Sequence, residues 1–442
     1  MSLIKIGRPN TRPTPVIFRL SNNQIRDNNE FGVYPQTSNG DIGAVYTMSN
    51  GAIMNQIIVS SLKSNGQLTL IQMISTNGTG VNTSMGDPLF SQGSLQIYSN
   101  CLFAVNPGSN SLSMFSIDRL NATNLTLVSV QQVKGWFPVS VTVNSMYACV
   151  LTGGNSTGIR CFTYNMSGLY VVPSMDRDLT SYISQSVPPS GPKGTMSEIL
   201  FSADNRSLIV SVKGYNSTMP GYLLFYLFSD LYTLAMNPIQ QKPTDGLLPF
   251  SMTLVGTNGL LVTDPGPNGV LTMNYMPTNG TISNSMLTPI NSTIAGALCW
   301  SAYSSMTGNY YVIGANPAAI VELRLNLSSM STPVQILQYY SLPNNTGALD
   351  TTIVNVAGTD YLFVIGITAH AVSSYRLNGP GSATFIGVFT VQQGDTSAIP
   401  KLAGVAAFIQ KTSSTATLIL PSITITMICF MYLSMVQTIF SF

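Results

Sequence analysis

The stretch LFAVNPGSNSLSMFSID, residues 102–118, decides the fold of this 442-residue chain. A run of four apolar residues, 102–105, is followed by Asn-Pro-Gly-Ser-Asn and then by Leu112, Met114 and Ile117 with serines between them. Asn, Pro, Gly and Ser favour tight turns, and the flanking runs have the composition of strands. The stretch therefore predicts a strand, a turn and a second strand.

The same pattern recurs along the chain. Apolar runs occur at residues 45–47, 102–106, 147–151, 208–212, 260–264, 310–314 and 361–366. Each is followed by a turn and an alternating strand, at residues 57–62, 112–117, 159–164, 222–227, 270–275, 319–324 and 372–377. Runs such as 125–130 and 139–143 add a third and a leading strand. Repeated units of four short strands predict an all-β, seven-bladed β-propeller.

The two ends of the repeat array complement each other. The first unit lacks a leading strand, and residues 404–409, GVAAFI, form a spare one. Pairing the spare strand with the first unit would close the ring and remove two open sheet edges. A β-sandwich or a solenoid would leave it unexplained. We therefore predict an N-terminal extension over 1–42, the propeller over 43–410 and a hydrophobic tail over 411–442.

The composition excludes some classes of function. Charged residues make up 8% of the chain, about a third of the usual share, and hydrophobic residues make up 45%. The formal net charge is +2, and no basic stripe with interleaved aromatic residues occurs. Nucleic acid is therefore not an expected partner.

Asn-x-Ser/Thr triplets are frequent and fall mostly in predicted turns, where a glycan acceptor must lie. Several would arise by chance in a chain rich in Asn, Ser and Thr. We predict instead a glycosylated extracellular or cell-surface protein, with acceptors at Asn77, Asn82, Asn121, Asn124, Asn155, Asn165, Asn205, Asn216, Asn279, Asn291, Asn326 and Asn344.

The cysteines do not have the spacing of metal ligands. There are five of them and one histidine, His370, so a structural zinc site is not expected. Cys149 and Cys161 flank a turn near Asn155, which places them opposite each other on paired strands. A disulfide and two buried free thiols both remain open there.

The N-terminal extension is basic and interrupted by prolines. It holds five of the chain's 18 basic residues within 26 positions, and it has no apolar run of the length that a secretory signal needs. This conflicts with the glycosylation triplets, so the route of export stays open.

The C-terminal tail has no charge after Lys411 and is long and apolar enough to span a bilayer, even with Pro421 inside it. It fits a glycolipid-anchor signal with small residues at Ser413 and Ser414, or a retained transmembrane helix. Lys411 favours a cytosol-facing propeller, whereas the triplets favour the outside. We expect a membrane anchor at the cell surface, with a cytosol-facing tail anchor as the alternative.

Several segments resemble a known family. The clearest are residues 43–50, GAVYTMSN, 86–95, GDPLFSQGSL, and 103–110, FAVNPGSN, and residues 137–141 and 373–377 extend the match. Together they resemble the lactonase-like seven-bladed propellers, which include 6-phosphogluconolactonase-type proteins and fungal 3-carboxymuconate cyclases. The resemblance covers roughly residues 43–410. It implies a small lactone or carboxylate substrate in the central channel, or at the mouth where the innermost strands begin.

Lactone opening needs a base and a group that stabilises the oxyanion. A carboxylated substrate also needs basic residues at the same mouth. The resemblance implies a histidine acting with Glu and Arg, but His370 is expected in a turn between two strands and matches no such base.

Candidate site residues lie at the starts of the leading strands. We predict Glu198 and Asp350 as catalytic residues and Gln92, Ser140, Ser251 and Trp300 as substrate-binding residues. The alternative is structural: acids beside turns bond the backbone, and Trp300 packs between blades.

No cofactor is expected, except that the two acids with Asp87 or Asp245 would suit a hard cation such as calcium. The chain is expected to be a monomer. Two functions remain open: a lactonase-like enzyme for a small lactone or carboxylate, and a non-catalytic propeller that binds a surface protein, a glycan or a wall component.

Overall fold

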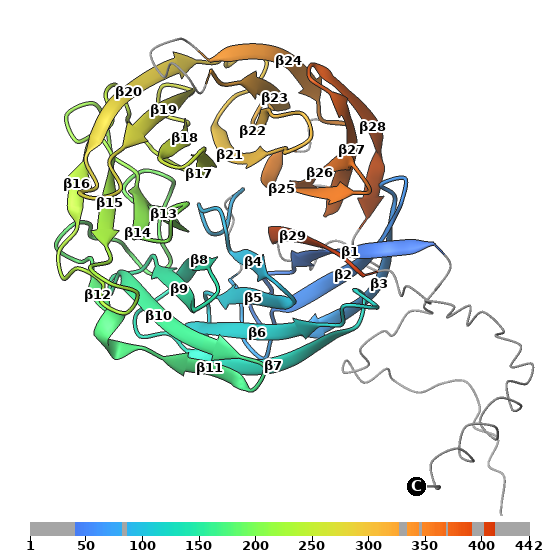
Figure 1. Cartoon of the computed structure of the whole chain (residues 1–442), viewed down its shortest axis with the longest axis horizontal. Helices are drawn as coiled ribbons and strands as arrows, with labels where there is room; N and C mark the ends of the chain where they lie inside the picture. The colour runs from blue at the N-terminus through green and yellow to red at the C-terminus, as the bar shows by residue number, and fades with distance from the viewer. Residues whose placement is uncertain are drawn as a thin grey trace, which may run out of the picture.

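Seven antiparallel sheets stand as blades around a central axis in the computed structural model (Figure 1). The structure describes residues 40–81, 86–326, 334–343, 347–367, 370–390 and 402–411. Each blade presents one strand to the axis and three further strands outwards, and the third blade has one additional short strand. The all-β, seven-bladed propeller predicted from the repeats is therefore confirmed.

From the inside outwards, blades 1 to 4 contain the following strands. Blade 1 has β29 (Ala403–Ile409), β1 (Asp41–Met48), β2 (Gln56–Lys63) and β3 (Leu68–Ser75). Blade 2 has β4 (Leu95–Tyr98), β5 (Cys101–Asn106), β6 (Ser111–Ile117) and β7 (Leu125–Gln132). Blade 3 has β8 (Pro138–Val143), β9 (Tyr147–Thr152), β10 (Gly158–Asn165) and β11 (Gly168–Val171), with β12 (Arg177–Asp178) also on β10 after the short helix η1 (Pro173–Met175). Blade 4 has β13 (Met196–Phe201), β14 (Ser207–Val212), β15 (Tyr222–Leu227) and β16 (Ile239–Gln241).

Blades 5 to 7 follow the same order. Blade 5 has β17 (Met252–Val255), β18 (Gly259–Asp264), β19 (Gly269–Tyr275) and β20 (Ile282–Pro289). Blade 6 has β21 (Leu298–Tyr303), β22 (Tyr310–Ala315), β23 (Ala318–Arg324) and β24 (Gln335–Ser341). Blade 7 has β25 (Ala348–Val356), β26 (Thr359–Gly366), β27 (Ala371–Gly379) and β28 (Ser382–Thr390).

The hairpin at residues 102–118 is the β5–β6 pair, with Phe103 opposite Met114. Every residue of β5 is buried, because the blade packs against a neighbour on both faces. A strand buried on both faces needs an unbroken apolar run, whereas a strand buried on one face alternates. This is why the second strand of each blade is the clearest signal in the sequence.

The ring closes as the sequence predicts. Strand β29 pairs antiparallel with β1, with Val45 opposite Ala407. Beyond the ladder, the Gln410 amide Nε2 donates to the carbonyl of Asp41 at 2.7 Å. Strand β1 begins two residues before the predicted boundary at 43. The tail beyond Lys411 and nearly all of the N-terminal extension lie outside the described residues.

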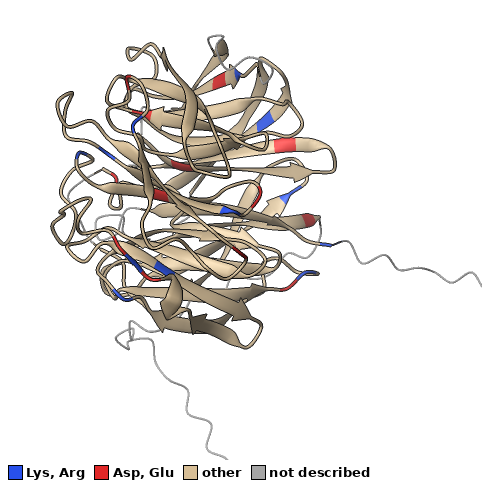
Figure 2. Cartoon of the chain, turned by 60° about the vertical axis from the view of Figure 1, so that its left-hand side comes forward, with Lys and Arg blue, Asp and Glu red and all other residues tan. Residues whose placement is uncertain are grey.

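Two further features concern the surface and the cysteines. Charged residues are sparse along the ribbon of the ring (Figure 2). Cys149 and Cys161 face each other on β9 and β10 and form a disulfide, which resolves the alternative left open above. Cys101 and Cys299 are buried free thiols. Within the part of the chain that the structure describes, no helix has the length and apolarity to cross a bilayer.

Candidate functional site

The centre of the ring is closed on one side by residues 86–94, which connect β3 to β4 and which we call the plug loop (Figure 1). Three blades hold it. The indole Nε1 of Trp300 donates to the carbonyl of Ser91 at 3.0 Å, and Lys213 donates to the carbonyl of Phe90. The Ser91 hydroxyl donates to the carbonyl of Val139 at 2.8 Å. These contacts lie where the innermost strands begin, so the plug loop blocks that mouth.

Gln92 fixes the plug loop to blade 6. Its amide Nε2 donates to the carbonyl of Ser301 at 3.0 Å, and the Ser301 N–H donates back to its Oε1 at 3.0 Å. The side-chain amide thus imitates a strand partner for β21. The Gly93 carbonyl accepts from Val141 N–H at 2.8 Å, which ties the same turn to blade 3.

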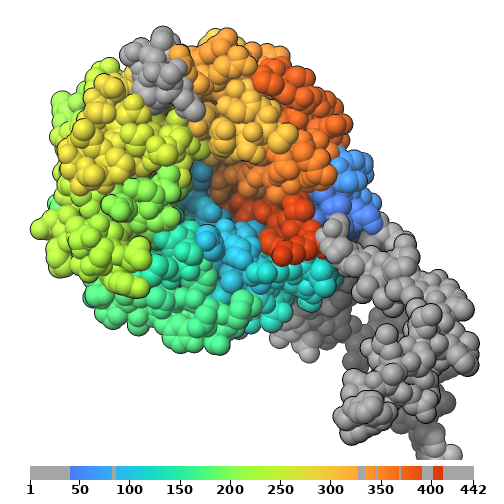
Figure 3. All heavy atoms as spheres, in the orientation of Figure 1, coloured from blue at the N-terminus to red at the C-terminus, as the bar shows by residue number. Residues whose placement is uncertain are grey.

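Beyond the plug loop the channel widens into a pocket of about 460 Å³. Six of the seven innermost strands line it, and Figure 3 shows the hollow at the centre of the ring. Leu254, Tyr303 and Ile353 lie late in their strands, so the pocket opens at the mouth where the innermost strands end. The sequence predicted a channel site but also considered the mouth that the plug loop closes.

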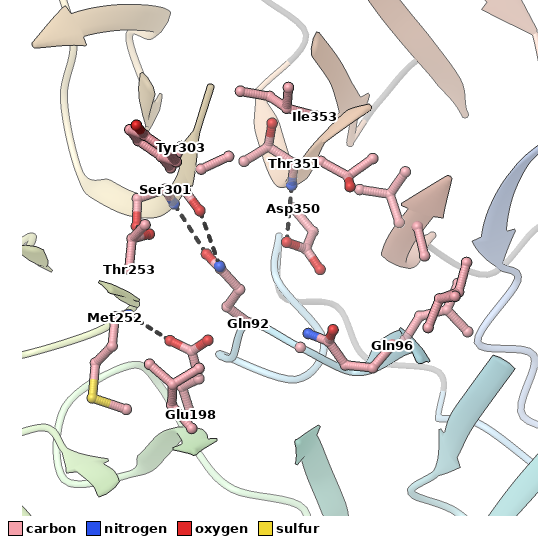
Figure 4. A pocket seen from close by; sticks show the side chains of 18 of the residues that line it. Gln92, Gln96, Glu198, Met252, Thr253, Ser301, Tyr303, Asp350, Thr351 and Ile353 are labelled. Carbon is pink, nitrogen blue, oxygen red and sulfur yellow. Dashed lines mark hydrogen bonds between the residues drawn. The ribbon is translucent and has the colours of Figure 1, made fainter. Parts of the chain in front are cut away.

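Glu198 and Asp350 both line this pocket, as Figure 4 shows around the amide of Gln92. Each lies in a β-bulge of an innermost strand. On β13 two residues between Met196 and Ile199 face one residue of β14, and on β25 the same occurs between Ala348 and Thr351. A bulge re-aims a side chain that regular pleating would turn elsewhere. The bulges thus help to set the direction of both carboxyl groups.

Burial dominates the titration of both acids. Burial raises the pKa of Asp350 to about 7, and the charge of Asp87 raises it further. The Thr351 N–H, which donates to Oδ1 of Asp350 at 2.9 Å, acts in the opposite direction and lowers this pKa. Burial also raises the pKa of Glu198 well above its usual range, although Met252 N–H donates to its Oε2. The charge of Asp350 raises the pKa of Glu198 further. Two such carboxyls ionise in separate steps, and charge on Asp350 favours the protonated form of Glu198.

The rest of the lining is uncharged. Among the described residues, no lysine or arginine lines the pocket. Its other polar side chains are the amides and hydroxyls of Gln92, Gln96, Thr253, Ser301, Tyr303, Thr351 and Thr352. Amides and hydroxyls suit a neutral, hydroxylated ligand, whereas a phosphate or carboxylate prefers an arginine or a lysine.

The other three predicted binding residues do not line this pocket. The Ser140 hydroxyl accepts from Ile199 N–H at 3.3 Å, so it joins blades 3 and 4. The Ser251 hydroxyl lies 2.9 Å from the hydroxyls of Thr263 and Ser301. Trp300 is buried and packs edge-on against Phe250, with ring centroids 5.5 Å apart. All three connect neighbouring parts of the scaffold.

The histidine and the suggested cation ligands lie elsewhere. His370 is half-buried in the turn before β27 and does not line the pocket. Asp245 is exposed in a turn, and Asp87 lies in the plug loop, where Leu89 and Phe90 N–H donate to it. Within the described ranges, no three acidic, histidine or cysteine side chains converge as metal ligands.

Sequence reasoning missed Gln96, Thr253, Tyr303 and Lys213. Gln96 projects into the pocket near Asp350 (Figure 4). Thr253 and Tyr303 lie two residues after Ser251 and Ser301, so period-two alternation along the leading strands was an available signal. Lys213 follows β14 just before a glycine, a position typical of a surface lysine, and its burial has no signature in the sequence.

Comparison with solved structures supports the fold. A putative 6-phosphogluconolactonase from Bacteroides fragilis is 12% identical and covers 85% of this chain and 99% of its own, with a TM-score of 0.59. A periplasmic gluconolactonase from Pseudomonas aeruginosa is 12% identical and covers 84% and 100%, with a TM-score of 0.61. A putative 6-phosphogluconolactonase from Bacteroides uniformis is 13% identical and covers 83% and 100%, with a TM-score of 0.56.

No family model matches the chain, and no curated protein matches it. At this level of identity the likeness shows the fold alone. The chain thus has the seven-bladed fold of the 6-phosphogluconolactonase-like structures, as the resemblance of its repeats implied.

Proposed function

We propose that this propeller is a cell-surface or secreted hydrolase that opens a small neutral lactone in its central pocket. The observation that carries the proposal is that Glu198 and Asp350 line one pocket whose other polar side chains are uncharged. Two buried carboxyls with separate ionisation steps provide a base and an acid in one site.

We assign Asp350 as the base and Glu198 as the acid, because the charge of Asp350 favours the protonated form of Glu198. Its carboxylate takes a proton from a water, whose oxygen forms a bond to the lactone carbonyl carbon. The ring C–O bond then breaks, and Glu198 gives its proton to the departing ring oxygen. The product is the open hydroxy acid, and one proton passes back from Asp350 to Glu198. The Gln96 amide is placed to donate to the carbonyl oxygen as negative charge develops on it.

The charge of the pocket limits the substrate class. The sequence left a lactone and a carboxylate open, and two of the similar structures are named for a phosphorylated lactone. An anionic group beside Glu198 and Asp350 would meet like charge with no cation opposite. We therefore favour a neutral lactone.

The test is turnover of gluconolactone and 6-phosphogluconolactone by the purified chain. The neutral lactone should have a kcat/KM on the order of 100-fold higher, because like-charge juxtaposition costs several kcal/mol. Glu198→Gln and Asp350→Asn should each lower kcat by roughly 100-fold or more, the usual range for an acid or base. Asp230→Asn, in an exposed turn, is the matched control. Equal turnover in Glu198→Gln and the control would remove Glu198 from the mechanism.

A neutral-glycan binding protein without catalysis is the second candidate, favoured by the amide and hydroxyl lining. It predicts saturable binding of a neutral sugar or lactone, measured by calorimetry, with no turnover. In that case Glu198→Gln would weaken binding but have no rate to change.

Three observations support an extracellular location. The Cys149–Cys161 disulfide is typical of oxidising compartments. Ten of the twelve triplet asparagines are described, and each lies in a turn or at a strand end; Asn82 and Asn344 lie outside the described residues. Nine of those ten are exposed, and Asn121 is half-buried. Attachment through the apolar tail is proposed from the sequence alone.

A further inference from the structure

A second, much smaller cavity lies behind Asp350. Its volume is about 10 Å³, close to the minimum that one water needs. Asp87, Ser91, Ser94 and Trp300 line it together with Asp350. Because Asp350 also lines the main pocket, it forms a wall between the two spaces.

Asp87 presents an unsatisfied oxygen in this region. Its Oδ1 accepts from Leu89 N–H at 2.9 Å and from Phe90 N–H at 2.8 Å. Its Oδ2 is buried and has no hydrogen-bond partner among the described residues. A buried carboxylate oxygen without a partner carries a large desolvation cost, which a bridging water would relieve.

Lys213 is the cation of this region. It is 1% exposed, lies over the Phe250 ring with Nζ 4.3 Å from the centroid, and donates to the carbonyls of Phe90 and Met196. It forms no salt bridge within 4.0 Å in the described structure, so it acts on Asp87 through space. Burial lowers the pKa of Lys213 and raises that of Asp87, and their opposite charges oppose both changes.

We propose that Asp87 in the plug loop and Lys213 after β14 are positioning residues that set the charge of Asp350, with one water in the small cavity bridging Asp87 and Asp350. The inference rests on the proposed function for its consequence in catalysis. The effect of Asp87 and Lys213 on the charge of Asp350 is inferred independently of catalysis. It rests on the small cavity, on the unpartnered Oδ2 of Asp87 and on the position of Asp350 between the small cavity and the main pocket.

The groups that face Asp350 decide the direction of the effect. Asp87 faces it from the plug loop and raises its pKa when charged, whereas the backbone N–H groups of Thr351, Val405 and Gly93 lower it. Glu198 lines the same pocket from β13, and its own pKa is raised by the charge of Asp350. The N–H groups of Leu89 and Phe90 and the charge of Lys213 favour the charged form of Asp87. Removing Lys213 lets Asp87 take up a proton, and the negative charge facing Asp350 is lost. Asp350 should then ionise at a lower pH, and Asp87→Asn should have the same result.

The experiment is a carboxyl carbon-13 NMR titration of the aspartates in the full chain, with Asp350→Asn identifying the Asp350 signal. Lys213→Met and Asp87→Asn should each lower its midpoint by about half a pH unit or more, the size expected for loss of a nearby charge. Lys134→Met is the matched control, because the Lys134 side chain is 76% exposed, and it should leave the midpoint unchanged.

Asp87→Asn changes the size of the side chain very little, so it still tests the proposal if Lys213→Met does not fold. An unchanged Asp350 midpoint in the folded variants would overturn the inference. A lowered midpoint in a protein that opens no lactone would support the charge relation and refute the proposed function, so the two failures are distinguishable. If the protein opens lactones, the pH at which kcat/KM rises should shift to a lower value in these variants, by the same amount as the titration midpoint of Asp350.

Discussion

At the scale of single residues, the proposed site depends on two carboxyl groups whose pKa values are raised by burial. An exposed aspartate is fully charged at pH 7, but burial raises the pKa of Asp350 to about 7. Glu198 is affected in the same direction, and more so while Asp350 is charged. The same desolvation that makes these groups costly to the fold supplies an acid and a base at one pH.

This pairing predicts a bell-shaped pH profile for lactone opening. Asp350 acts as the charged form, so kcat/KM should rise with pH through about 7, where its pKa lies. Glu198 acts as the protonated form, and because its pKa is also raised, the rate should fall again at higher pH. The remaining activity of Asp350→Asn should no longer rise with pH near 7, and that of Glu198→Gln should no longer fall at higher pH. A profile that is flat from pH 5 to 9 would contradict the assignment.

At the scale of elements, the hydrogen bond that ties the plug loop to Trp300 should contribute to stability and not to substrate binding. Trp300→Phe keeps the packing against Phe250 but removes the hydrogen bond to the Ser91 carbonyl. Loss of one buried hydrogen bond should lower the free energy of unfolding by about 1–3 kcal/mol. Because Trp300 does not line the main pocket, KM should stay the same. A raised KM with unchanged denaturant stability would instead make Trp300 a binding residue.

Elements also explain which parts of the site were predictable. Runs such as β5 are buried on both faces, and this leaves an unbroken apolar signature in the sequence. Glu198 and Asp350 could be proposed from the sequence because they are the only carboxylates among the candidates at the starts of the leading strands. Ser140 and Ser251 occupy similar places but bond neighbouring strands. Bulges and the plug loop decide between these outcomes, and neither has a sequence pattern.

At the scale of the whole molecule, the ring depends on one strand from the far end of the chain. Removing residues 402–442 deletes β29 and exposes the inner edge of β1, so the protein should aggregate or unfold without a cooperative transition. Removing only residues 412–442 keeps β29 and the bonds of Gln410 and Lys411, and should leave the melting transition unchanged. Light scattering and circular dichroism compare the two truncations. A soluble, cooperatively folded 402–442 deletion would mean that closure by β29 is dispensable.

The outer surface gives a whole-molecule test of location. Nine exposed asparagines in acceptor triplets surround a ring with few charges, and a disulfide joins two of its strands. If the chain passes through a secretory compartment, enzymatic removal of N-linked glycans from protein made in its own cells should lower its mass by several glycans. Cys149 and Cys161 should then resist alkylation until a reductant is added, whereas Cys101 and Cys299 should react once the chain is unfolded. The same chain made in a reducing cytosol is the control and should show neither property. An unchanged mass together with alkylation of Cys149 and Cys161 without reductant would place the propeller in the cytosol and favour the cytosol-facing tail anchor.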